Sequence, residues 1–321
     1  MSSLSKELDN LISDWFENLE LPKQPAGLYN PIRYAMTSGG KRLRPTLLLA
    51  AVKAFNGNLE SARNQCIGIE MFHNFTLLHD DVMDNSDVRR GQLTVHRRWN
   101  NNTAILSGDT MLTIATQCIA ECPSGVLPRV LETFNTTAIQ VYEGQQLDMD
   151  YEERKDVTVD EYLEMIKLKT SVLLACALKI GAILAGADEI DTDALYEYGI
   201  KIGLGFQLRD DYLDTFGDPL IFGKQIGGDI LNEKKTWLMI TAQNEDKDGK
   251  LGKALNESAN EDEKVQNVTA IYKDLNLDSR ILDLIRLYSE EAIQIAEKLN
   301  ITSEAKEYFI SLANELINRS H

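Results

Sequence analysis

Two copies of one acidic pattern are the residues of this sequence best suited to chemistry. Their first aspartates lie 130 residues apart, and the copies comprise Asp80, Asp81 and Asp84 in LLHDDVMD, and Asp210, Asp211 and Asp214 in LRDDYLD. On a helix, the first and last aspartate of each copy lie one turn apart on one face. Carboxylates gathered in one cavity repel each other unless cations lie between them. Mg²⁺ fits best, because it takes oxygen ligands from one or two carboxylates, water and substrate phosphates. The two copies therefore predict a metal-bridged diphosphate.

For either copy alone, a solvated helix face is the alternative, because 50 of the 321 residues are Asp or Glu. Both copies, however, follow apolar segments, FHNFTLLH and GLGFQL. Their acids also have apolar neighbours, Val82 and Met83 in the first copy and Tyr212 and Leu213 in the second. Aspartates with such apolar neighbours are not expected on a fully solvated helix face.

Composition indicates a globular protein, since 43% hydrophobic residues suffice for a large core. The net charge of −17 argues against a nucleic-acid partner. Length alone suggests about two domains, but a site that needs both aspartate segments requires the two halves to meet. We therefore predict a single domain over residues 1–321.

Targeting signals and cysteine motifs are both missing from the sequence. The first residues, MSSLSKELDN, show no basic and then apolar signal segment. The most apolar stretch, SVLLACALKIGAILAGA from Ser171, is short for a bilayer span and contains Lys179, so we predict a core helix and no transmembrane segment. The four cysteines have no CxxC spacing, and we expect buried, reduced thiols in a cytoplasmic protein without zinc.

Helical periodicity runs through most of the chain, and no alternating strand pattern appears. Apolar stripes mark a first helix (Leu4, Leu8, Leu11, Ile12, Trp15, Leu19) and a late one (Leu282, Leu284, Ile285, Leu287, Ile293, Ile295). Clusters of Gly, Pro, Asn and Asp predict breaks at 21–31, 56–58, 85–96, 122–124, 216–229 and 244–250. The pattern predicts an all-α helical bundle.

Basic residues gather beside glycines near both aspartate segments. The segment GGKRLRP contains Lys41 and Arg44 ahead of a predicted helix, whose N-terminal amides also favour an anion. Arg89 and Arg90 follow the first aspartate segment, and Lys224 and Lys234 follow the second. Arginine binds phosphate bidentately and lysine supplies a point charge. The groups suit two diphosphates, one held through metal and one held directly.

The ordered motifs GGKRLRP, HDDVMDNSDVRRGQLTVH, KLKT, GFQLRDDYLD and GKQIGGD resemble those of the trans-isoprenyl diphosphate synthases, the polyprenyl synthetase family, from about residue 38 to 237. The resemblance implies an all-α, single-domain bundle around a deep central cavity, usually as a homodimer. It also implies a prenyltransferase that joins isopentenyl diphosphate head-to-tail to an allylic diphosphate. The match is to short-chain geranylgeranyl and farnesyl diphosphate synthases.

The resemblance also assigns residues. In the family, the aspartate motifs hold three Mg²⁺ ions on the allylic diphosphate, which implies this role for Asp80, Asp81, Asp84, Asp210, Asp211 and Asp214. The positions that grip the same diphosphate are Arg89, Lys169, Lys224 and Lys234. Those that bind isopentenyl diphosphate are Lys41, Arg44, His73 and Arg90. Thr170 and Gln207 match polar positions near the allylic cation.

Other residues near these motifs have competing interpretations. His79 adjoins Asp80, and we interpret it as a support of the metal ligands that binds no metal itself. Ser107 and Asp109 in ILSGDT, and Gln145 and Asp148 in GQQLD, resemble family motifs, but helix capping or core hydrogen bonding explains them equally well.

Product length depends on the residues before Asp80. On an ideal helix the side chains of Thr76, Phe72 and Ile69 point within about 100° of the direction of the Asp80 side chain. Geometry therefore favours Phe72 as the floor of the cavity, whereas the resemblance favours Phe75. Large residues at both places, with the small Thr76 between, predict a product of fifteen or twenty carbons, with twenty favoured. The preferred allylic starter, and whether Arg319 and His321 help to close the site, stay open.

Two other functions remain as alternatives. A terpene cyclase also ionises a prenyl diphosphate through an aspartate-rich motif, but it binds no second diphosphate, and its second metal motif usually mixes Asn, Ser or Thr with Glu. A non-catalytic subunit of a two-chain synthase typically lacks intact aspartate motifs. The second DDYLD and the GGKRLRP segment favour the synthase.

Overall fold

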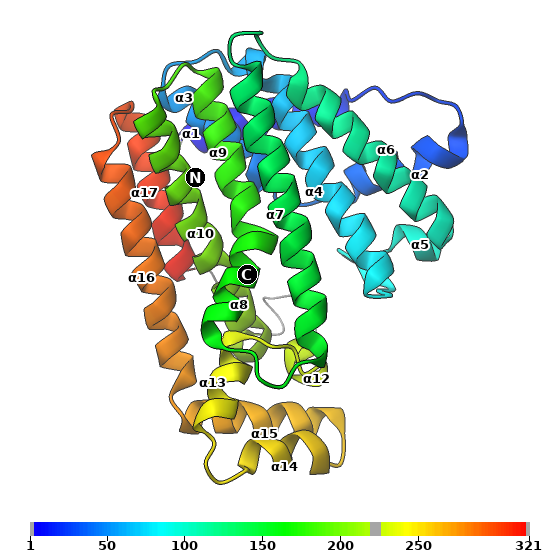
Figure 1. The fold of residues 1–321 in the computed structure, drawn as a ribbon, viewed down its shortest axis with the longest axis vertical. Coiled ribbons are helices and arrows are strands. Elements are labelled where there is room, and N and C mark those ends of the chain that lie inside the picture. Colours follow the sequence, from blue (N-terminus) through cyan, green and yellow to red (C-terminus); the bar gives the residue numbers. More distant parts are fainter. Residues whose placement is uncertain (1–2, 219–225, 319–321) are drawn as a thin grey trace. The chain divides into compact units, whose positions relative to one another are not determined.

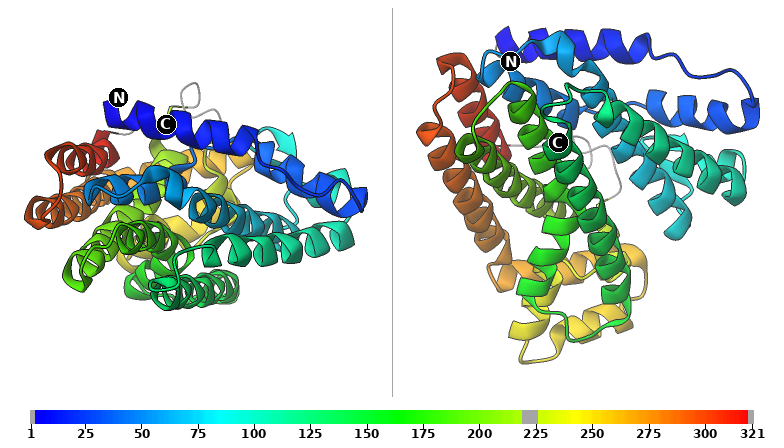
Figure 2. Two further views of the ribbon diagram at one scale, coloured as in Figure 1. Left: turned by 90° about the horizontal axis from the view of Figure 1, so that it is seen from above. Right: turned by 45° about the horizontal axis from the view of Figure 1, so that its top comes forward.

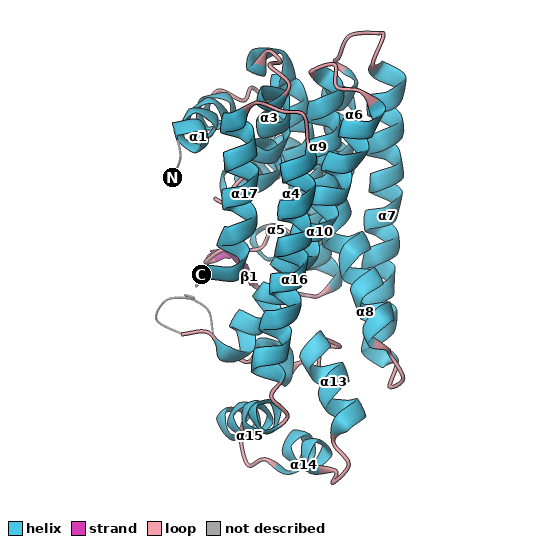
Figure 3. Cartoon of the chain, turned by 90° about the vertical axis from the view of Figure 1, so that its left-hand side faces the viewer, coloured by secondary structure: helices cyan, strands magenta, loops and turns pink. Residues whose placement is uncertain are grey.

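The computed structural model describes residues 3–218 and 226–318, and nearly all of its regular structure is helical (Figure 3). The chain forms two compact units. Unit 1 comprises Met1–Asn135, Cys176–Thr192 and Ile301–Tyr308, and unit 2 comprises Thr136–Ala175, Asp193–Asn300 and Phe309–His321. The predicted all-α class is confirmed, and the single domain stays a prediction.

Unit 1 is built mainly on α4 and α6, which pack along each other (Figures 1 and 2). Its elements are α1 (Ser3–Glu17), α2 (Ala26–Thr37), α3 (Leu43–Ala54), the 3₁₀ turn η1 (Leu59–Ala62), α4 (Arg63–Met83), β1 (Val88–Arg89), β2 (Gln92–Leu93), α5 (Val95–Arg98) and α6 (Asn101–Ala120).

Unit 2 carries the second aspartate segment. Its elements are α8 (Val159–Ile166), the π-helical turn η2 (Lys167–Ser171), α12 (Gly228–Leu231), α13 (Trp237–Glu245), α14 (Lys250–Glu257), α15 (Glu261–Asp274) and α16 (Leu277–Lys298). Four helices contain residues of both units: α7 (Leu127–Glu153), α9 (Val172–Leu184), α10 (Glu189–Phe216) and α17 (Ser303–Asn318).

The apolar patterns predict the buried faces of two helices correctly. In α1 the residues Leu4, Leu8, Ile12 and Trp15 are buried, whereas Leu11 is half-buried and Leu19 lies beyond the end of the helix at Glu17. The stretch predicted as a core helix forms α9, whose residues are buried except for the half-buried Lys179 and Leu184. Among the described helices, none is long and apolar enough to cross a membrane. All four cysteines are free; Cys66 and Cys176 are buried, whereas Cys118 and Cys122 are only half-buried.

Three local predictions differ from the structure. The break at 21–31 is too long, because α2 begins at Ala26 and includes Pro31 in its first turns. Two short strands pair within 85–96, where no strand was expected. Of the stripe predicted for α16, only Ile285 is buried, Leu287 is exposed and the other four residues are half-buried. The buried face consists of Leu277, Ile281, Ile285, Ser289, Ala292 and Ala296.

Candidate active site

The first aspartate segment lies at the C-terminal end of α4. Asp81 is buried with 5% of its surface exposed, Asp80 is half-buried, and Asp84 is exposed. Asp84 caps the helix, with its backbone N–H donating to the Asp80 carbonyl at 2.8 Å. Asn85 then has a left-handed φ of 53°, which stops the helix. The three carboxylates therefore differ strongly in their access to solvent.

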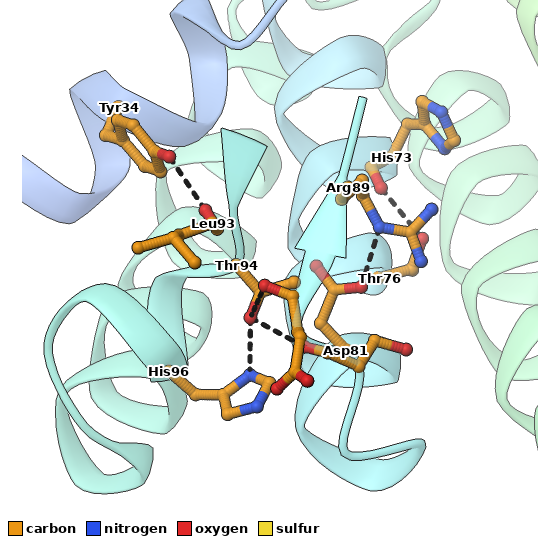
Figure 4. Close-up of polar contacts among 10 residues, drawn as sticks. Tyr34, His73, Thr76, Asp81, Arg89, Leu93, Thr94 and His96 are labelled. Carbon is orange, nitrogen blue, oxygen red and sulfur yellow. Dashed lines mark hydrogen bonds and ion pairs between the residues drawn. The ribbon is translucent and has the colours of Figure 1, made fainter. Parts of the chain in front are cut away.

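A two-stranded hairpin brings an arginine back to Asp81. Arg90 and Gly91 form its turn with φ values of 52° and 74°, and positive values at both positions suit the right-handed twist of a tight hairpin. Arg89 Nε donates to Asp81 Oδ1 at 2.7 Å (Figure 4). The Tyr34 hydroxyl donates to the Leu93 carbonyl at 2.7 Å and anchors the second strand to α2. Burial raises the pKa of the Asp81 carboxyl, and Arg89 acts in the opposite direction.

Basic residues of unit 1 gather around a buried carboxylate, Glu70. Burial lowers the pKa of Arg44 to about 10, while Glu70 raises it and Arg90 lowers it. Burial also lowers the pKa of His73 well below its ordinary value, and Arg44 and Arg90 lower it further, so the imidazole is neutral. Arg90 also donates to the Gly39 carbonyl. Among the described residues, Nε of Arg44 and Oε2 of Glu70 are buried without a hydrogen-bond partner.

A small cavity lies beside this cluster in unit 1. Its volume is about 40 Å³, enough for about three water molecules. Asn74 and Asp81 of α4 line it together with Arg89 and Arg90 of the hairpin. Unit 1 thus brings together four of the predicted basic residues, Arg44, His73, Arg89 and Arg90. Lys41, which precedes Arg44 in the GGKRLRP segment, is exposed.

The second aspartate segment lies near the C-terminal end of α10. Asp211 is buried, and both of its oxygens accept hydrogen bonds, Oδ1 from Gln207 Nε2 at 3.1 Å and Oδ2 from the Tyr162 hydroxyl. Asp214 is half-buried, and its Oδ2 accepts from the Asp229 backbone N–H at 2.9 Å. Asp210 is half-buried.

The acidic residues of unit 2 disfavour one another's ionisation. Burial and Asp229 raise the pKa of Asp211 to about 8, while the hydrogen bonds from Tyr162 and Gln207 lower it. Burial and Asp214 raise the pKa of Asp229 to about 6, while Lys234 lowers it. A cation bound here would therefore favour the charged carboxylates.

The turn η2 places Lys169 and Thr170 in unit 2. Lys169 forms an ion pair with Asp148 of α7, and Thr170 Oγ1 donates to Gln207 Oε1 at 3.2 Å. Two glycines let the turn pack against backbone: a Cβ on Gly144 would lie 2.3 Å from the Lys169 nitrogen, and one on Gly203 would lie 2.5 Å from Ser171 Cα. The π-helical turn η2 is thus packed tightly between α7 and α10. Turns of this kind are frequent at functional sites.

Aromatic residues before the first aspartate segment form a packed cluster in unit 1. Phe72 is fully buried, with its ring centroid 5.6 Å from that of Phe75 and 5.2 Å from that of Phe134 on α7. The ring centroids of Phe75 and His79 lie 4.8 Å apart. Thr76 Oγ1 donates to the His73 carbonyl at 2.8 Å.

The flanking motif residues mostly contact backbone. His79 Nε2 lies 3.1 Å from the Ile105 carbonyl oxygen and 4.0 Å from Asp109 Oδ1. Ser107 Oγ donates to the Leu28 carbonyl at 3.1 Å. The Gln145 amide is buried without a partner among the described atoms.

The structure leaves some predicted residues apart. The two aspartate segments belong to different units, so their convergence on one cavity stays a prediction. Lys224, Arg319 and His321 lie outside the described residues. No three described His, Cys, Asp or Glu side chains form a ready metal site. The donor set still matches Mg²⁺, because all six aspartates offer hard oxygen ligands and substrate phosphates normally complete its coordination.

Sequence reasoning missed three residues that contact the candidates: Glu70, Tyr162 and Asp229. Asp229 ends the GKQIGGD motif, and its acidic type was a usable signal. Glu70 precedes His73 by three residues, so the helical spacing could have placed them on one face. No spacing pointed to Tyr162, which lies 49 residues from Asp211.

Comparison with known proteins decides the family. The family model for polyprenyl synthetases matches residues 25–275. The chain belongs to the polyprenyl synthetase family. A geranylgeranyl pyrophosphate synthase from Geoglobus acetivorans is 37% identical, covering 100% of both chains. The predicted resemblance to trans-isoprenyl diphosphate synthases is thereby confirmed.

Solved polyprenyl synthetases share the fold as well. The crystal structure of a geranylgeranyl pyrophosphate synthase has a TM-score of 0.94 at 43% identity and covers 100% of each chain. A second such synthase, from Corynebacterium glutamicum and complexed with isoprenyl diphosphate and magnesium, has a TM-score of 0.87 at 26% identity and covers 98% of each chain. This chain therefore has the isoprenoid synthase fold.

Proposed function

We propose that this polyprenyl synthetase is a short-chain prenyltransferase that condenses isopentenyl diphosphate with dimethylallyl, geranyl or farnesyl diphosphate. Its main product is geranylgeranyl diphosphate, with twenty carbons. One observation carries the proposal: besides Arg89 and the aspartates, which suit one metal-bound diphosphate, unit 1 gathers Arg44, His73 and Arg90, which suit a second diphosphate held directly. The names of the similar synthases support the same reaction.

The aspartates are proposed to hold three Mg²⁺ ions when substrate is bound. Asp81 and Asp211 are buried, so we assign direct metal contact first to Asp80, Asp84, Asp210 and Asp214, and a supporting role to the two buried carboxylates. Bound Mg²⁺ acts as a Lewis acid that neutralises the departing diphosphate. The magnesium in the structure of the Corynebacterium relative supports the choice of metal.

The basic residues are proposed to divide between the substrates. Arg44 and Arg90 supply planar donor pairs for isopentenyl diphosphate, and the neutral His73 adds a hydrogen bond without further charge. Lys41 completes this group. Arg89, Lys169, Lys224 and Lys234 are assigned to the allylic diphosphate.

The polar residues of unit 2 are proposed to face the reacting end of the allylic chain. Thr170 and Gln207 are hydrogen-bonded to each other, which orients the amide oxygen of Gln207. Oriented oxygens of this kind stabilise developing positive charge without reorganising during the reaction.

A cytoplasmic homodimer completes the proposal. Ile105 and Leu106 of α6 are 46% and 59% exposed, and a second subunit over this face of α6 would remove both apolar side chains from water. Sedimentation equilibrium tests this part, and a monomer at micromolar concentration would contradict it.

Pyrophosphate release and product chromatography test the reaction. Purified protein with Mg²⁺ should release pyrophosphate only when both an allylic diphosphate and isopentenyl diphosphate are present, and the dephosphorylated product should co-elute with geranylgeraniol. A terpene cyclase would release pyrophosphate from the allylic substrate alone. A non-catalytic subunit would release none, and either result would overturn the proposal.

A further inference from the structure

The second aspartate segment is held by a chain of hydrogen bonds that links three elements of unit 2. The Tyr162 hydroxyl, on α8, donates to Asp211 Oδ2. Gln207 Nε2 donates to Asp211 Oδ1 at 3.1 Å. Thr170 Oγ1, in η2, donates to Gln207 Oε1 at 3.2 Å. Asp211 is therefore restrained from α8 on one side and from η2 on the other.

Burial makes these restraints strong. Tyr162 is 2% exposed and Asp211 is 5% exposed. A buried carboxylate that loses a donor suffers a desolvation penalty of about 1–3 kcal/mol or more, so Asp211 is held in one orientation while both donors are present. The next residues on the same helical turns, Asp210 and Asp214, take their directions from this anchored stretch of α10.

The Tyr162 hydroxyl stays protonated and donates to Asp211 Oδ2. Burial raises the pKa of Tyr162 well above its ordinary value, and Asp211, Asp229 and Asp148 raise it further.

We propose that Tyr162 is a positioning residue of the reaction: its hydroxyl fixes Asp211 and so sets the second aspartate segment against the turn that carries Lys169 and Thr170. The inference rests on the proposed function of this segment as a holder of metal-bound diphosphate. It predicts that loss of the hydroxyl weakens diphosphate binding specifically, and not only the fold.

Unit 2 offers a matched control. Tyr198 is also fully buried, and its hydroxyl donates to the Phe309 carbonyl at 2.7 Å. Tyr198→Phe therefore removes a buried phenol hydroxyl of the same chemistry without touching an aspartate. A purely structural role for Tyr162 predicts equal behaviour of the two variants.

The test measures binding of Mg²⁺ with inorganic pyrophosphate by titration calorimetry, without turnover. Tyr162→Phe should weaken binding about tenfold, which corresponds to about 1.4 kcal/mol, whereas Tyr198→Phe should stay within about twofold of wild type. In an Asp211→Ala background, which has no oxygen to accept from the phenol, Tyr162→Phe should have no further effect, because a double-mutant cycle isolates the pair. Steady-state assays should show a higher KM for the allylic diphosphate, with KM for isopentenyl diphosphate little changed.

Equal weakening by both tyrosine variants, unchanged binding in Tyr162→Phe, or a full effect in the Asp211→Ala background would each overturn the inference. If Tyr162→Phe does not fold, Gln207→Met removes the other donor to Asp211 and must show the same tenfold loss. Absence of prenyl product from the wild-type chain would instead refute the proposed function, while the calorimetric cycle would still decide the role of Tyr162.

Discussion

Raising the pH of the metal-free protein from 6.5 to 8 should lower its free energy of unfolding by about 2 kcal/mol. The cause is Asp211, whose pKa burial and Asp229 raise from 3.8 to about 8. Between these values the folded protein holds a proton that the unfolded chain has released, so the contribution of Asp211 to stability is greatest at low pH and is lost as pH rises toward 8.

Two other shifted groups, His73 and Asp229, titrate mainly near or below the lower end of this window. The pKa of His73 is lowered well below 6.5, so His73 contributes stability that is gained as the pH rises through 6.5 and offsets a small part of the fall. Asp229, with a pKa of about 6, has released most of its proton before the window begins. The slope for Asp211 is about 1.4 kcal/mol per pH unit and flattens near its own pKa, which gives the total of about 2 kcal/mol.

Urea unfolding followed by circular dichroism, in the presence of a chelator, measures the effect at both pH values. Asp211→Asn is the control, because an amide does not titrate, and its stability should change little over the window. Constant or rising stability of the wild type, or the same fall in Asp211→Asn, would refute the reasoning.

Four further expectations follow from the site. Asp80→Ala and Asp210→Ala should each cut turnover by roughly 100-fold or more while thermal stability is kept, because removing a carboxylate relieves repulsion; near-normal activity in either would exclude its metal role. Arg44→Ala should raise KM for isopentenyl diphosphate by roughly tenfold or more and that for the allylic substrate far less, and equal effects would show that the sites are misassigned. Phe75→Ala should lengthen the chromatographed product beyond twenty carbons, and wild-type chains beyond thirty would contradict the proposed floor. Gly203→Ala places a Cβ 2.5 Å from Ser171 Cα and should cost about 1–3 kcal/mol in urea unfolding, so unchanged stability would argue against tight packing at the turn.

Helical elements could be predicted where large apolar residues define the buried face. Leu4, Leu8 and Ile12 recur at the helical period, and all are buried in α1. In α16 the buried face contains Ser289 and Ala296, whose small side chains permit close packing but carry little hydrophobic signal. Counting large apolar residues therefore selects the wrong face.

The hairpin of unit 1 was not predictable from alternation, because its strands are only two residues long. Its turn depends on Arg90 and Gly91 adopting positive φ. Arginine is not a typical residue for this conformation, which is favoured by Asn, Asp and Gly. The motif containing Arg89 was recognisable, but its return to Asp81 depends on tertiary structure.

Contacts across elements were the least predictable part of the site. Helical spacing correctly groups each aspartate triplet because its residues share a few turns of one helix. Helical periodicity does not predict which helices lie next to each other. It therefore could not identify Tyr162, which lies 49 residues from Asp211 in the sequence, as a partner of Asp211. Asp148 was recognised by motif, but its ion pair with Lys169 appears only once α7 packs on η2.

The two aspartate segments share one structural logic although they lie in different units. In each, the middle aspartate is buried and accepts a hydrogen bond from a residue outside its own helix: Arg89 for Asp81, and Tyr162 for Asp211. A buried carboxylate is costly unless it is paired in this way, so the pattern is difficult to explain by surface charge. The charged arginine and the neutral phenol differ in effect, because only the first adds a positive charge beside its aspartate. The first segment is therefore partly neutralised within its own unit, whereas the second keeps an excess of carboxylates and has the greater need of a cation.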